Sequence, residues 1–340
     1  RFTDEKEDAL RRDFTINGMF WDIDAEQVVD HVGGRKDLQL KIIRAIGKPR
    51  ERFQEDRLRM MRAIRFSTIL QFPIEPETWD AVVDEAKFID DVSGERIRDE
   101  LERIIMSPHR LAGYQLLSDS GLMQCILPEI EQMRDVMQPP QFHPEGDVFV
   151  HTGLVLSHLS EPSFTLAMGA LLHDVGKPGT FEDAEDRIRF HGHDELGATI
   201  SEKICDRLRL SRQQTERIVY LVRRHLVFMN VPQMRIARRY RLFEEDGFEE
   251  LLELCRVDCL GSHADMSLYE TCLGMWNEWK ERAPSRDPLL KGRDLIQMGM
   301  KPGPEIGSML EALEDARRES EVVDRDAAIA WVQARLDGRQ

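Results

Sequence analysis

The sequence predicts a mainly helical protein that begins with a short segment of β structure. Beyond residue 50, apolar residues recur at intervals of three and four, the spacing of one face of a helix. Residues 1–48 instead hold short apolar runs separated by glycines, which is typical of brief strands joined by turns. Two proline-rich stretches divide the helical part, so this chain of 340 residues is expected to form two or three domains.

The N-terminal segment is predicted to contain the strands. Residues 1–12 are highly charged and are expected to be helical or looped. Residues 13–22 form the first candidate strand region. The apolar pair Val28-Val29 is a second candidate, and the apolar run at residues 42–46 is a third.

The next segment, residues 49–138, is predicted to be a helical layer. One helix would bury Met60, Met61, Ile64 and Phe66 on a single face. Another would begin at Ser93, whose hydroxyl suits an N-cap. Its apolar face would hold Ile97, Leu101, Ile104 and Ile105. Residues 111–122 are expected to continue the layer.

The remaining boundaries follow from proline and glycine. Pro139-Pro140 and the residues up to 146 form the clearest linker, and a second all-helical unit is predicted over residues 147–280. Pro284 within residues 282–287, and Pro288 directly after them, mark another junction. A tail over residues 288–340 should end in two helices that follow Pro304.

Composition excludes several classes of protein. The formal net charge of −16 excludes a generally basic nucleic-acid coat, so RNA contacts must come from local arginine clusters. Five scattered cysteines without a Cys-x-x-Cys pair exclude a disulfide framework and a zinc–thiolate site. No apolar stretch is long enough to span a membrane and no signal peptide is visible, so a cytoplasmic location without membrane partners is expected.

The strongest chemical signal is the pair His173-Asp174, which ends an apolar helical run and precedes Gly176-Lys177-Pro178. Imidazole nitrogen and carboxylate oxygen together suit a divalent transition metal, Mg²⁺ or Mn²⁺. Further candidate ligands lie on both sides, at His151, His193, His225 and Asp258. A carboxylate beside a histidine could bridge two metals that polarise a phosphate and activate a water. The alternative is a polar helix end with a simple hydrogen bond; the surrounding histidines favour the metal site.

A second signal lies near the N-terminal end. Arg11-Arg12 could clamp a triphosphate, and the acid or amide at Asp13 and Asn17 could hold a ribose hydroxyl. Farther on, Asp56, Arg59 and Arg62 step by three and would share one face of a helix. An aspartate can accept from an exocyclic amine while an arginine donates to the neighbouring ring nitrogen, which matches cytosine or adenine and mismatches uracil or guanine. The alternative is a solvated, salt-bridged helix face.

The ordered set of motifs resembles the bacterial tRNA nucleotidyltransferase and poly(A) polymerase family, the class II CCA-adding enzymes and their relatives. The resemblance rests on residues 11–17, 30–38, 55–59, 62–66, 92–97, 120–122, 127–130, 292–296 and 302–304. It implies a C-terminal remnant of a polymerase-β-like nucleotidyltransferase head over residues 1–48, then a helical neck and body, an all-helical HD domain and a helical tail. It also implies that Asp56, Arg59 and Arg62 select CTP and ATP, and that Arg12, Asp13 and Asn17 contact the incoming nucleotide.

The chain departs from that family's pattern at its start. The family's Gly-rich segment and its Asp-x-Asp carboxylates precede the Arg-Arg-Asp motif, and neither stands before Arg11 in this sequence. Because Arg1 opens within a charged run, we expect this chain to be the downstream part of a longer one. Taken alone, it is expected not to transfer nucleotides. Asp22 and Asp24 fall after the nucleotide motif and are expected in a strand or turn.

Residues 147–230 resemble the HD phosphohydrolase domain that some members of the family carry. The resemblance assigns His151, His173, Asp174 and Asp258 to one metal (Mg, Mn or Ni). His193 and His225, with Asp174 bridging, complete a second metal site, and His173 and Asp174 are the expected catalytic pair. His191 is the less favoured histidine of its pair, and His143, His158 and His263 are expected at the surface or in support. Two interpretations of Lys177 remain open: it contacts a phosphate, or it is a solvated loop lysine.

The predicted function is therefore the addition of CMP and/or AMP to RNA 3′ ends, most simply those of tRNA, with ATP and CTP as substrates. The HD domain would hydrolyse phosphomonoesters, or 2′,3′-cyclic or 2′-phosphates, in RNA-end repair. Two alternatives remain: a stand-alone HD metallophosphohydrolase, and a non-catalytic RNA-binding module. No oligomeric state is predicted.

Overall fold

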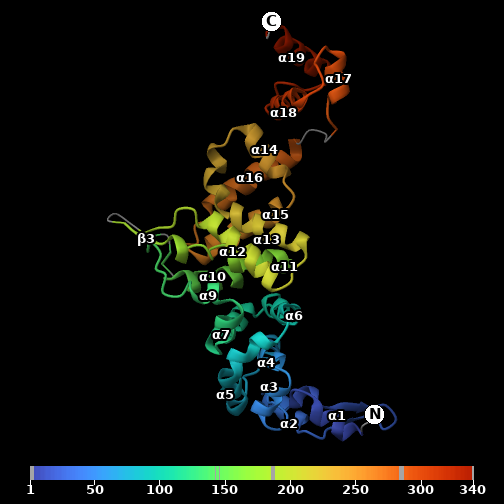
Figure 1. Ribbon diagram of the computed structural model, residues 1–340, viewed down its shortest axis with the longest axis vertical. Helices are drawn as coiled ribbons and strands as arrows, with labels where there is room; N and C mark the ends of the chain where they lie inside the picture. Colours follow the sequence, from blue (N-terminus) through green and yellow to red (C-terminus); the bar gives the residue numbers. More distant parts are fainter. Residues whose placement is uncertain (1–3, 142, 145, 185–187, 283–286, 339–340) are drawn as a thin grey trace. The chain divides into compact units, whose positions relative to one another are not determined.

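The computed structural model describes residues 4–141, 143–144, 146–184, 188–282 and 287–338 (Figure 1). Helices dominate, and the described residues contain two small two-stranded sheets. The chain forms two compact units, one of residues 1–226 with 253–265 and one of residues 227–252 with 266–340. This confirms the predicted mainly helical fold class, whereas the bounds of the four predicted domains remain predictions.

The N-terminal segment combines short helices with a single hairpin. Its elements are α1 (Glu5–Arg11), the 3₁₀ helix η1 (Thr15–Asn17), β1 (Phe20–Asp22), β2 (Gln27–Val29) and α2 (Gly34–Leu40). The strands are antiparallel, with Trp21 opposite Val28. The region therefore holds the short β structure that the sequence predicts.

Residues 42–46 are not a regular strand, so that expectation is wrong. The segment makes isolated bridges on both sides, Ala45 with Phe14 and Ile43 with Ile74. Ile43 exchanges backbone hydrogen bonds with residues 73 and 75, and Ile46 N donates to Asp13 O at 3.0 Å. Each neighbouring segment meets it at one point only, so no ladder develops. Ile43, Ala45 and Ile46 are nevertheless buried, and the segment ties the residue 13 region to the helical body.

The body is a helical layer centred on α4. Its elements are α3 (Pro49–Glu55), α4 (Leu58–Leu70), α5 (Pro76–Glu85), η2 (Ala86–Asp91), α6 (Gly94–Ile105), α7 (Arg110–Asp119), α8 (Leu122–Ile126) and α9 (Pro128–Glu131). Helix α4 packs against α6 and α7. The side chains fully buried there include Met60, Met61, Ile64, Leu101, Ile104 and Leu117. Phe66 is only partly buried, and its ring lies edge-on to Phe14 at 5.6 Å between centroids.

The start of α6 differs in detail from the expected cap. Ser93 is at the N-cap position, but its side chain makes no hydrogen bond to the helix backbone. Gly94 follows it, and an added Cβ at Gly94 would stand 2.1 Å from the carbonyl oxygen of Arg207. The absence of a side chain at Gly94 therefore allows α6 to approach the chain at Arg207.

The histidine-rich part of the first unit is built from four main helices. Its elements are α10 (Val148–Ser157), α11 (Phe164–Leu172), η3 (Pro178–Thr180), β3 (Glu182–Asp183), β4 (Ile188–Arg189), α12 (His193–Arg207) and α13 (Arg212–Arg224). The 3₁₀ helix η4 (His225–Gln233) begins in this unit and continues into the second. Helix α13 packs against both α11 and α12. All but Thr165 of α11 is buried, as its continuous apolar run requires. The strands β3 and β4 pair antiparallel, and Figure 1 shows β3 at the outer side of these helices.

The predicted linker at Pro139-Pro140 is partly folded back onto the protein. Val148 N donates to Val136 O at 3.0 Å, and Met137 bridges to Asp147. Asp147 in turn caps α10, because its carboxylate accepts from Val150 N at 2.8 Å. Gln138 is 1% exposed. The stretch before the prolines is therefore a packed part of the fold.

The second unit consists of α14 (Ile236–Glu244), α16 (Ser267–Arg282), α17 (Gly292–Gln297), α18 (Pro304–Arg318) and α19 (Arg325–Asp337). Helix α15 (Phe248–Gly261) begins in this unit and ends in the first. The tail has its own apolar core, which includes Leu295, Leu313 and Val332. Two helices follow Pro302-Gly303, as predicted.

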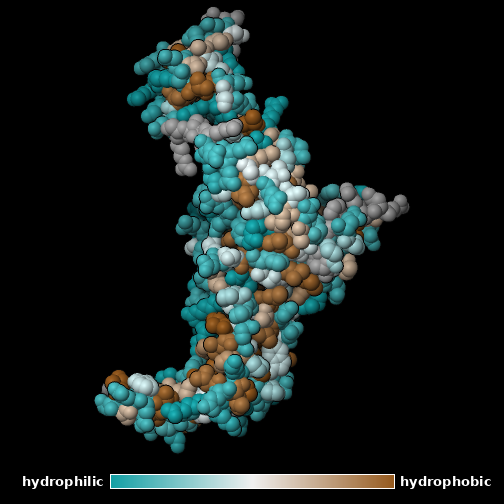
Figure 2. Space-filling model, turned by 180° about the vertical axis from the view of Figure 1, so that it is seen from behind, coloured by the Kyte–Doolittle hydropathy of each residue, from teal (hydrophilic) through white to brown (hydrophobic). Residues whose placement is uncertain are grey.

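Apolar side chains on the surface are dispersed. Figure 2 shows them in small groups among polar residues on the face that it presents. Trp21, Ile23 and Val323 are among the most exposed. Within the described residues, no helix is long and apolar enough to cross a lipid bilayer.

We expect Gly94→Ala to lower the midpoint of thermal unfolding, because the new Cβ would collide with backbone at Arg207. Overpacking of this kind costs about 1–3 kcal/mol. The control is Gly274→Ala in α16, where nothing lies within 4 Å of the new Cβ. That exposed helical position should gain about 0.5–1 kcal/mol. Equal effects of the two substitutions in calorimetry would contradict the close approach at Gly94.

Candidate metal centre and nucleotide site

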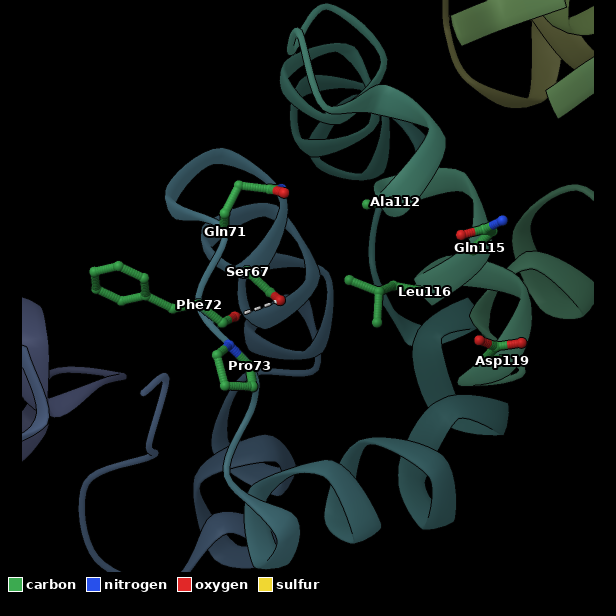
Figure 3. Close-up of a pocket in the computed structure, with 8 residues that line it drawn as sticks. All are labelled: Ser67, Gln71, Phe72, Pro73, Ala112, Gln115, Leu116 and Asp119. Atoms are coloured by element: carbon green, nitrogen blue, oxygen red, sulfur yellow. Dashed lines mark hydrogen bonds between the residues drawn. The ribbon is translucent and has the colours of Figure 1, made fainter. Parts of the chain in front are cut away.

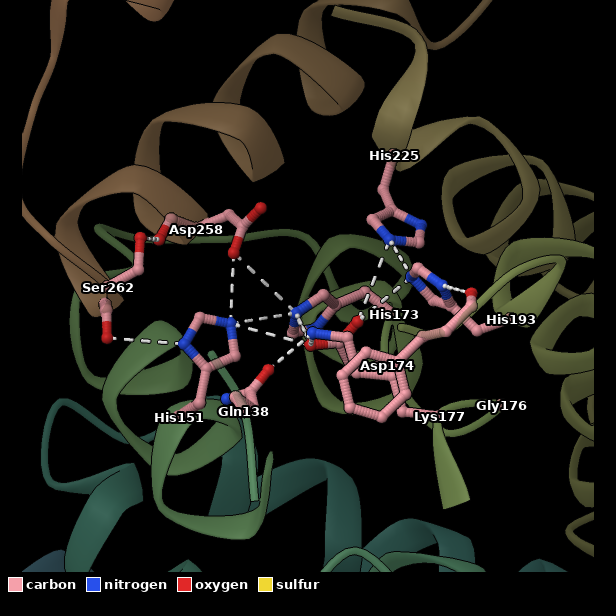
Figure 4. A network of polar contacts seen from close by, with 12 residues as sticks. Gln138, His151, His173, Asp174, Gly176, Lys177, His193, His225, Asp258 and Ser262 are labelled. Carbon is pink, nitrogen blue, oxygen red and sulfur yellow. Dashed lines mark hydrogen bonds and ion pairs between the residues drawn. The ribbon is translucent and has the colours of Figure 1, made fainter. Parts of the chain in front are cut away.

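The six predicted metal ligands lie together in the first unit (Figure 4). They form two groups, and within each group the ligand atoms lie within 4.8 Å of one another. The first group is His151, His173 and Asp258, and the second is Asp174, His193 and His225. Figure 4 shows Asp174 between His151 on one side and His193 on the other. Residues more than 100 positions apart in the chain thus converge on one centre.

The four imidazole rings are held in one tautomer by the backbone. In each ring Nδ1 faces a carbonyl oxygen, which can only accept, so Nδ1 carries the proton. The acceptors are Gly261 O for His151 (3.3 Å), Ala170 O for His173 (2.8 Å), Phe190 O for His193 (2.7 Å) and Val222 O for His225 (2.6 Å). Each Nε2 is left with its lone pair available to a ligand.

These Nε2 atoms face one another in pairs. They are 3.3 Å apart between His173 and His151, and 3.2 Å apart between His193 and His225. Two lone pairs at this separation repel unless a cation lies against them. The donor set of nitrogen and carboxylate oxygen fits a divalent metal there.

The Asp174 carboxylate faces the histidines of both groups. Its Oδ2 lies 3.1 Å from His173 Nε2 and 3.6 Å from His151 Nε2. Its Oδ1 lies 3.5 Å from His193 Nε2 and 3.8 Å from His225 Nε2. The side chain is 2% exposed. Asp174 is therefore placed to bridge two ions.

Asp258, which lies on helix α15, is the third member of the first group. Its Oδ1 lies 3.0 Å from His151 Nε2 and 3.9 Å from His173 Nε2. Unlike the other five ligands, its side chain is 34% exposed. Solvent therefore reaches the centre beside Asp258.

At neutral pH the two carboxylates are ionised and the His225 ring is neutral, which are the forms that bind a metal. Burial raises the pKa of the Asp174 carboxyl, but attraction to His173 and Lys177 outweighs it and holds the pKa well below its ordinary range. Burial lowers the pKa of His225 to about 4, so that ring is neutral at pH 7. Burial also raises the pKa of Asp258, but its contact with His151 outweighs burial and the net shift is downward, so that carboxyl stays ionised.

Two further polar side chains belong to the centre. Lys177 is 6% exposed, so it is not a solvated loop lysine. Its Nζ donates to Asp174 Oδ2 at 2.7 Å and to Gln138 Oε1 at 2.6 Å. Gln138 was not predicted, because it stands in the proline-rich stretch that indicates a linker.

The other histidines fall outside the two groups. His191 is exposed in the turn before α12, whereas His193 is the buried first residue of that helix. The ring of His143 lies edge-on to His151 at 4.9 Å between centroids. His158 and His263 are exposed.

Part of the predicted nucleotide site converges on Asp13. The Asp13 side chain is buried, and its Oδ1 accepts from Asn17 Nδ2 at 2.7 Å. Its Oδ2 accepts from Arg62 Nε at 2.5 Å. Burial raises the Asp13 pKa, but Arg62 outweighs it and the carboxyl stays ionised. Arg12 Nη1 donates to Asn17 O at 3.0 Å. The fold thus joins the Arg-Arg-Asp motif to the helix of Arg62.

The expectation that Asp56 shares a helix with Arg59 and Arg62 is wrong. Helix α3 ends at Glu55 and α4 begins at Leu58, so Asp56 lies in the break between them. Its Oδ1 accepts from Leu58 N at 3.1 Å, a local bond that competes with a continuous helix. Its Oδ2 pairs with Arg96 Nη2 at 2.8 Å. Asp56 therefore lies just before the N-terminus of α4, not within the helix.

Arg59 lies in the first turn of α4 and is tied to neighbouring segments. It donates to Glu55 Oε2 at 2.8 Å, to Arg52 O at 3.0 Å and to Arg11 O at 2.9 Å. The last contact places it beside the Arg-Arg-Asp motif. Arg59 and Arg62 consequently both reach the N-terminal segment.

A pocket of about 300 Å³ lies apart from both sets of residues (Figure 3). Its lining is Ser67, Gln71, Phe72, Pro73, Ala112, Gln115, Leu116 and Asp119. This lining contains no Lys, Arg or His, so it offers no cation for a phosphate.

Three family models match the chain. The poly A polymerase head domain matches residues 1–44, and a region described as "Probable RNA and SrmB-binding site of polymerase A" matches residues 71–133. The HD domain matches residues 148–262, which contain all six ligands of the two groups.

Curated relatives align along nearly the whole chain. It is similar to an A-adding tRNA nucleotidyltransferase of Deinococcus radiodurans, at 33% identity over 96% of this chain and 79% of the relative. A CC-adding tRNA nucleotidyltransferase of Thermus thermophilus is 32% identical over 98% of this chain and 78% of the relative. A multifunctional CCA protein of Xanthomonas campestris is 32% identical over 92% of this chain and 77% of the relative.

Solved structures show the same fold. A CCA-adding enzyme of Bacillus stearothermophilus in complex with CTP superposes with a TM-score of 0.71 at 22% identity, over 99% of this chain and 76% of that chain. A CCA-adding enzyme of Thermotoga maritima complexed with tRNA gives a TM-score of 0.60 at 21% identity, over 98% of this chain and 74% of that chain. The mainly helical architecture is therefore that of these enzymes.

We expect Gly176→Ala to weaken metal binding by about tenfold or more, the size of effect seen when support of a ligand is lost. The new Cβ would stand 2.1 Å from His193 O and 2.7 Å from Gly197 N, so the first turn of α12 must move and carry His193 with it. Titration calorimetry with Mn²⁺ measures the effect.

The matched control is Gly179→Ala, whose Cβ meets only the flexible end of the Leu196 side chain. It should bind Mn²⁺ like the unaltered chain. Identical Mn²⁺ affinity in both variants would show that the position of His193 does not depend on Gly176.

Proposed function

Because the chain belongs to the tRNA nucleotidyltransferase and poly(A) polymerase family, we propose that it serves the maturation of RNA 3′ ends through two sites. One site is a metal-dependent phosphohydrolase centre in the HD domain. The other selects CTP and/or ATP for addition to the 3′ end of tRNA. We place both activities in the cytoplasm.

The phosphohydrolase proposal rests on the position of Asp174, because its two carboxylate oxygens face two separate pairs of histidines. His151, His173 and Asp258 would hold one divalent ion, and His193 and His225 a second, with Asp174 between them. Bound there, a pair of divalent ions (Mg, Mn or Ni) supplies Lewis-acid activation of a phosphoryl group and of a water molecule. His173 and Asp174 act as the central ligands of this reaction.

The protein's own groups define how a substrate would bind. The exposed edge beside Asp258 provides access for a phosphate ester. Lys177 places an ammonium group 2.7 Å from Asp174 Oδ2, where it can donate to a phosphate oxygen. Elsewhere the ligands are buried, which strengthens these electrostatic contacts.

The proposed substrates are phosphomonoesters and 2′,3′-cyclic or 2′-phosphates on nucleotides or RNA ends. Nucleotide addition requires a free 3′ hydroxyl, and a cyclic phosphate blocks it. Water attack that breaks the P–O3′ bond frees the 3′ hydroxyl and leaves a 2′-phosphate, which a second hydrolysis releases as inorganic phosphate. The HD site would thereby prepare the same RNA end that the nucleotidyltransferase extends. This shared substrate favours an RNA-end repair role over a stand-alone phosphohydrolase.

Nucleotide selection is assigned to Asp56, Arg59 and Arg62, with Arg12, Asp13 and Asn17 on the triphosphate and sugar. The ion pair between Arg62 and Asp13 supports this, because it joins the two motifs across 49 residues of sequence. Asp56 and Arg59 are partnered by Arg96 and Glu55, and a nucleotide would replace those contacts. Asp56 would accept from the exocyclic amine of cytosine or adenine.

We expect Asp174→Asn and His173→Ala each to reduce metal-dependent hydrolysis of 2′,3′-cyclic AMP by at least about 100-fold, since each removes a central ligand. Turnover of this substrate and of bis(p-nitrophenyl) phosphate is measured with Ni²⁺, Mn²⁺ or Mg²⁺. Elemental analysis gives the bound metal.

His158→Ala serves as the control, because His158 is exposed and outside both ligand groups. It should retain full turnover. Absence of both turnover and bound metal in the unaltered chain would contradict the phosphohydrolase proposal.

For nucleotide selection, Asp56→Ala should weaken CTP and ATP binding by about 5- to 150-fold, the range for losing a base-edge contact worth about 1–3 kcal/mol. UTP binding should be weak in both proteins. Asp24→Ala, an exposed aspartate outside the site, is the control. Equal affinity of the unaltered chain for CTP and UTP in calorimetry would contradict the assignment.

A further inference from the structure

Gln138 lies at the metal centre although it belongs to none of the three matched regions. It stands between α9 and α10, outside residues 71–133 and 148–262. Its side chain is 1% exposed, and in Figure 4 it points to Lys177 from the side of His151. A buried amide in a proline-rich stretch requires a physical reason.

The orientation of the amide is fixed by its partner. Lys177 Nζ can only donate, so the group that it meets at 2.6 Å must be the carbonyl oxygen of Gln138. The amide nitrogen, Nε2, then faces away from Lys177. Nε2 is buried and has no hydrogen-bond partner among the residues that the structure describes. Leaving a donor unsatisfied is unfavourable, so Gln138 does not optimise stability at this position.

The backbone around Gln138 is anchored to the helix that carries a metal ligand. Met137 bridges to Asp147, and Asp135 N donates to Asp147 Oδ2 at 2.8 Å. Asp147 caps α10, and His151 lies one turn into that helix. The position of Gln138 is therefore set by the same helix start that positions His151.

Lys177 needs a second acceptor if the centre binds metal. Its other partner, Asp174 Oδ2, is also the oxygen that faces His151 and His173. When that oxygen serves as a metal ligand, its hold on the lysine weakens and the nearby positive charge repels the ammonium. A neutral acceptor such as Gln138 can keep Lys177 in place without cancelling its charge.

We propose that Gln138 is a positioning residue of the HD site, holding the Lys177 ammonium where it can bind a phosphate oxygen of the substrate. This inference rests on the proposed phosphohydrolase function. An ammonium has three N–H donors, and Asp174 and Gln138 accept two of them. The third is directed to the substrate. A carboxylate in place of Gln138 would hold the lysine equally well but would neutralise it.

The test compares Gln138→Met, Gln138→Glu, Lys177→Met and the double variant Gln138→Met/Lys177→Met. Gln141→Met is the matched control, because Gln141 lies in the same stretch and is exposed. The readouts are KM and kcat for 2′,3′-cyclic AMP, the affinity of the Mn²⁺-loaded protein for inorganic phosphate, and the bound Mn²⁺ itself.

Gln138→Met should raise KM and weaken phosphate binding by about tenfold or more, as expected when a bond to a charged group is lost. Bound Mn²⁺ should be unchanged and kcat should change less than KM. The double variant should be no worse than Lys177→Met alone, because Gln138 acts through the lysine. Gln138→Glu should also weaken phosphate binding, whereas a purely structural acceptor would be replaced by glutamate without loss.

Thermal unfolding separates positioning from folding. Gln138→Met removes one hydrogen bond but also removes the unsatisfied donor, so its midpoint should stay within about 4 °C of the unaltered chain. Gln138→Glu provides the functional comparison if the methionine variant is unstable.

Unchanged phosphate affinity in Gln138→Met, full recovery in Gln138→Glu, or additive losses in the double variant would each overturn the inference. Loss of Mn²⁺ from Gln138→Met would overturn it as well, because the residue would then support the metal ligands. Absence of turnover in the unaltered chain would overturn the phosphohydrolase proposal alone, since phosphate binding is measured separately.

Discussion

The metal centre depends on the fixed orientation of four imidazole rings around one carboxylate. Three of the rings obtain that orientation in the same local way, by donating Nδ1–H to the carbonyl three residues earlier. For His173 and His225, that carbonyl belongs to the last turn of a helix, where carbonyls lack a partner within the helix. One hydrogen bond therefore satisfies an end carbonyl and directs Nε2 to the centre. The helix ends thus determine the geometry of the ligands.

Burial then determines the chemistry of these ligands. The environment is apolar because α11 is buried along its length, and this keeps His225 neutral at pH 7. The same environment would disfavour the Asp174 anion, but His173 and the Lys177 ammonium, which lie against the carboxylate, keep its pKa low. Asp258 retains contact with solvent and leaves a route for a substrate. The centre is consequently buried and holds an ionised carboxylate, with one open edge beside Asp258.

The sequence predicted the components of this centre better than their surroundings. The residue types at His173, Asp174 and the four outlying ligands indicate a metal site, and the fold brings all six together. The error at Asp56 has a local cause: its side chain bonds to Leu58 N and ends one helix before the next begins. Residues 42–46 are mostly apolar, which predicts a strand. Each neighbouring segment, however, pairs with them at a single point. Gln138 could not be found from sequence because its role depends on how a loop folds back onto α10.

The two proposed sites also differ in how they prepare for a ligand. At the metal centre, backbone carbonyls hold the histidines before any ligand arrives. At the nucleotide site, the selecting side chains already have protein partners: Asp56 pairs with Arg96, and Arg12 pairs with Asp8. These pairs are exposed, and exposed ion pairs contribute only about 0–1 kcal/mol each. A nucleotide that offers a base edge and a triphosphate can replace them at little energetic cost, whereas Asp13 is buried and its pair with Arg62 joins the two motifs before a nucleotide binds. The arrangement of the candidate metal ligands is thus set by folding, and we propose that the nucleotide site is completed by exchange of surface partners on binding.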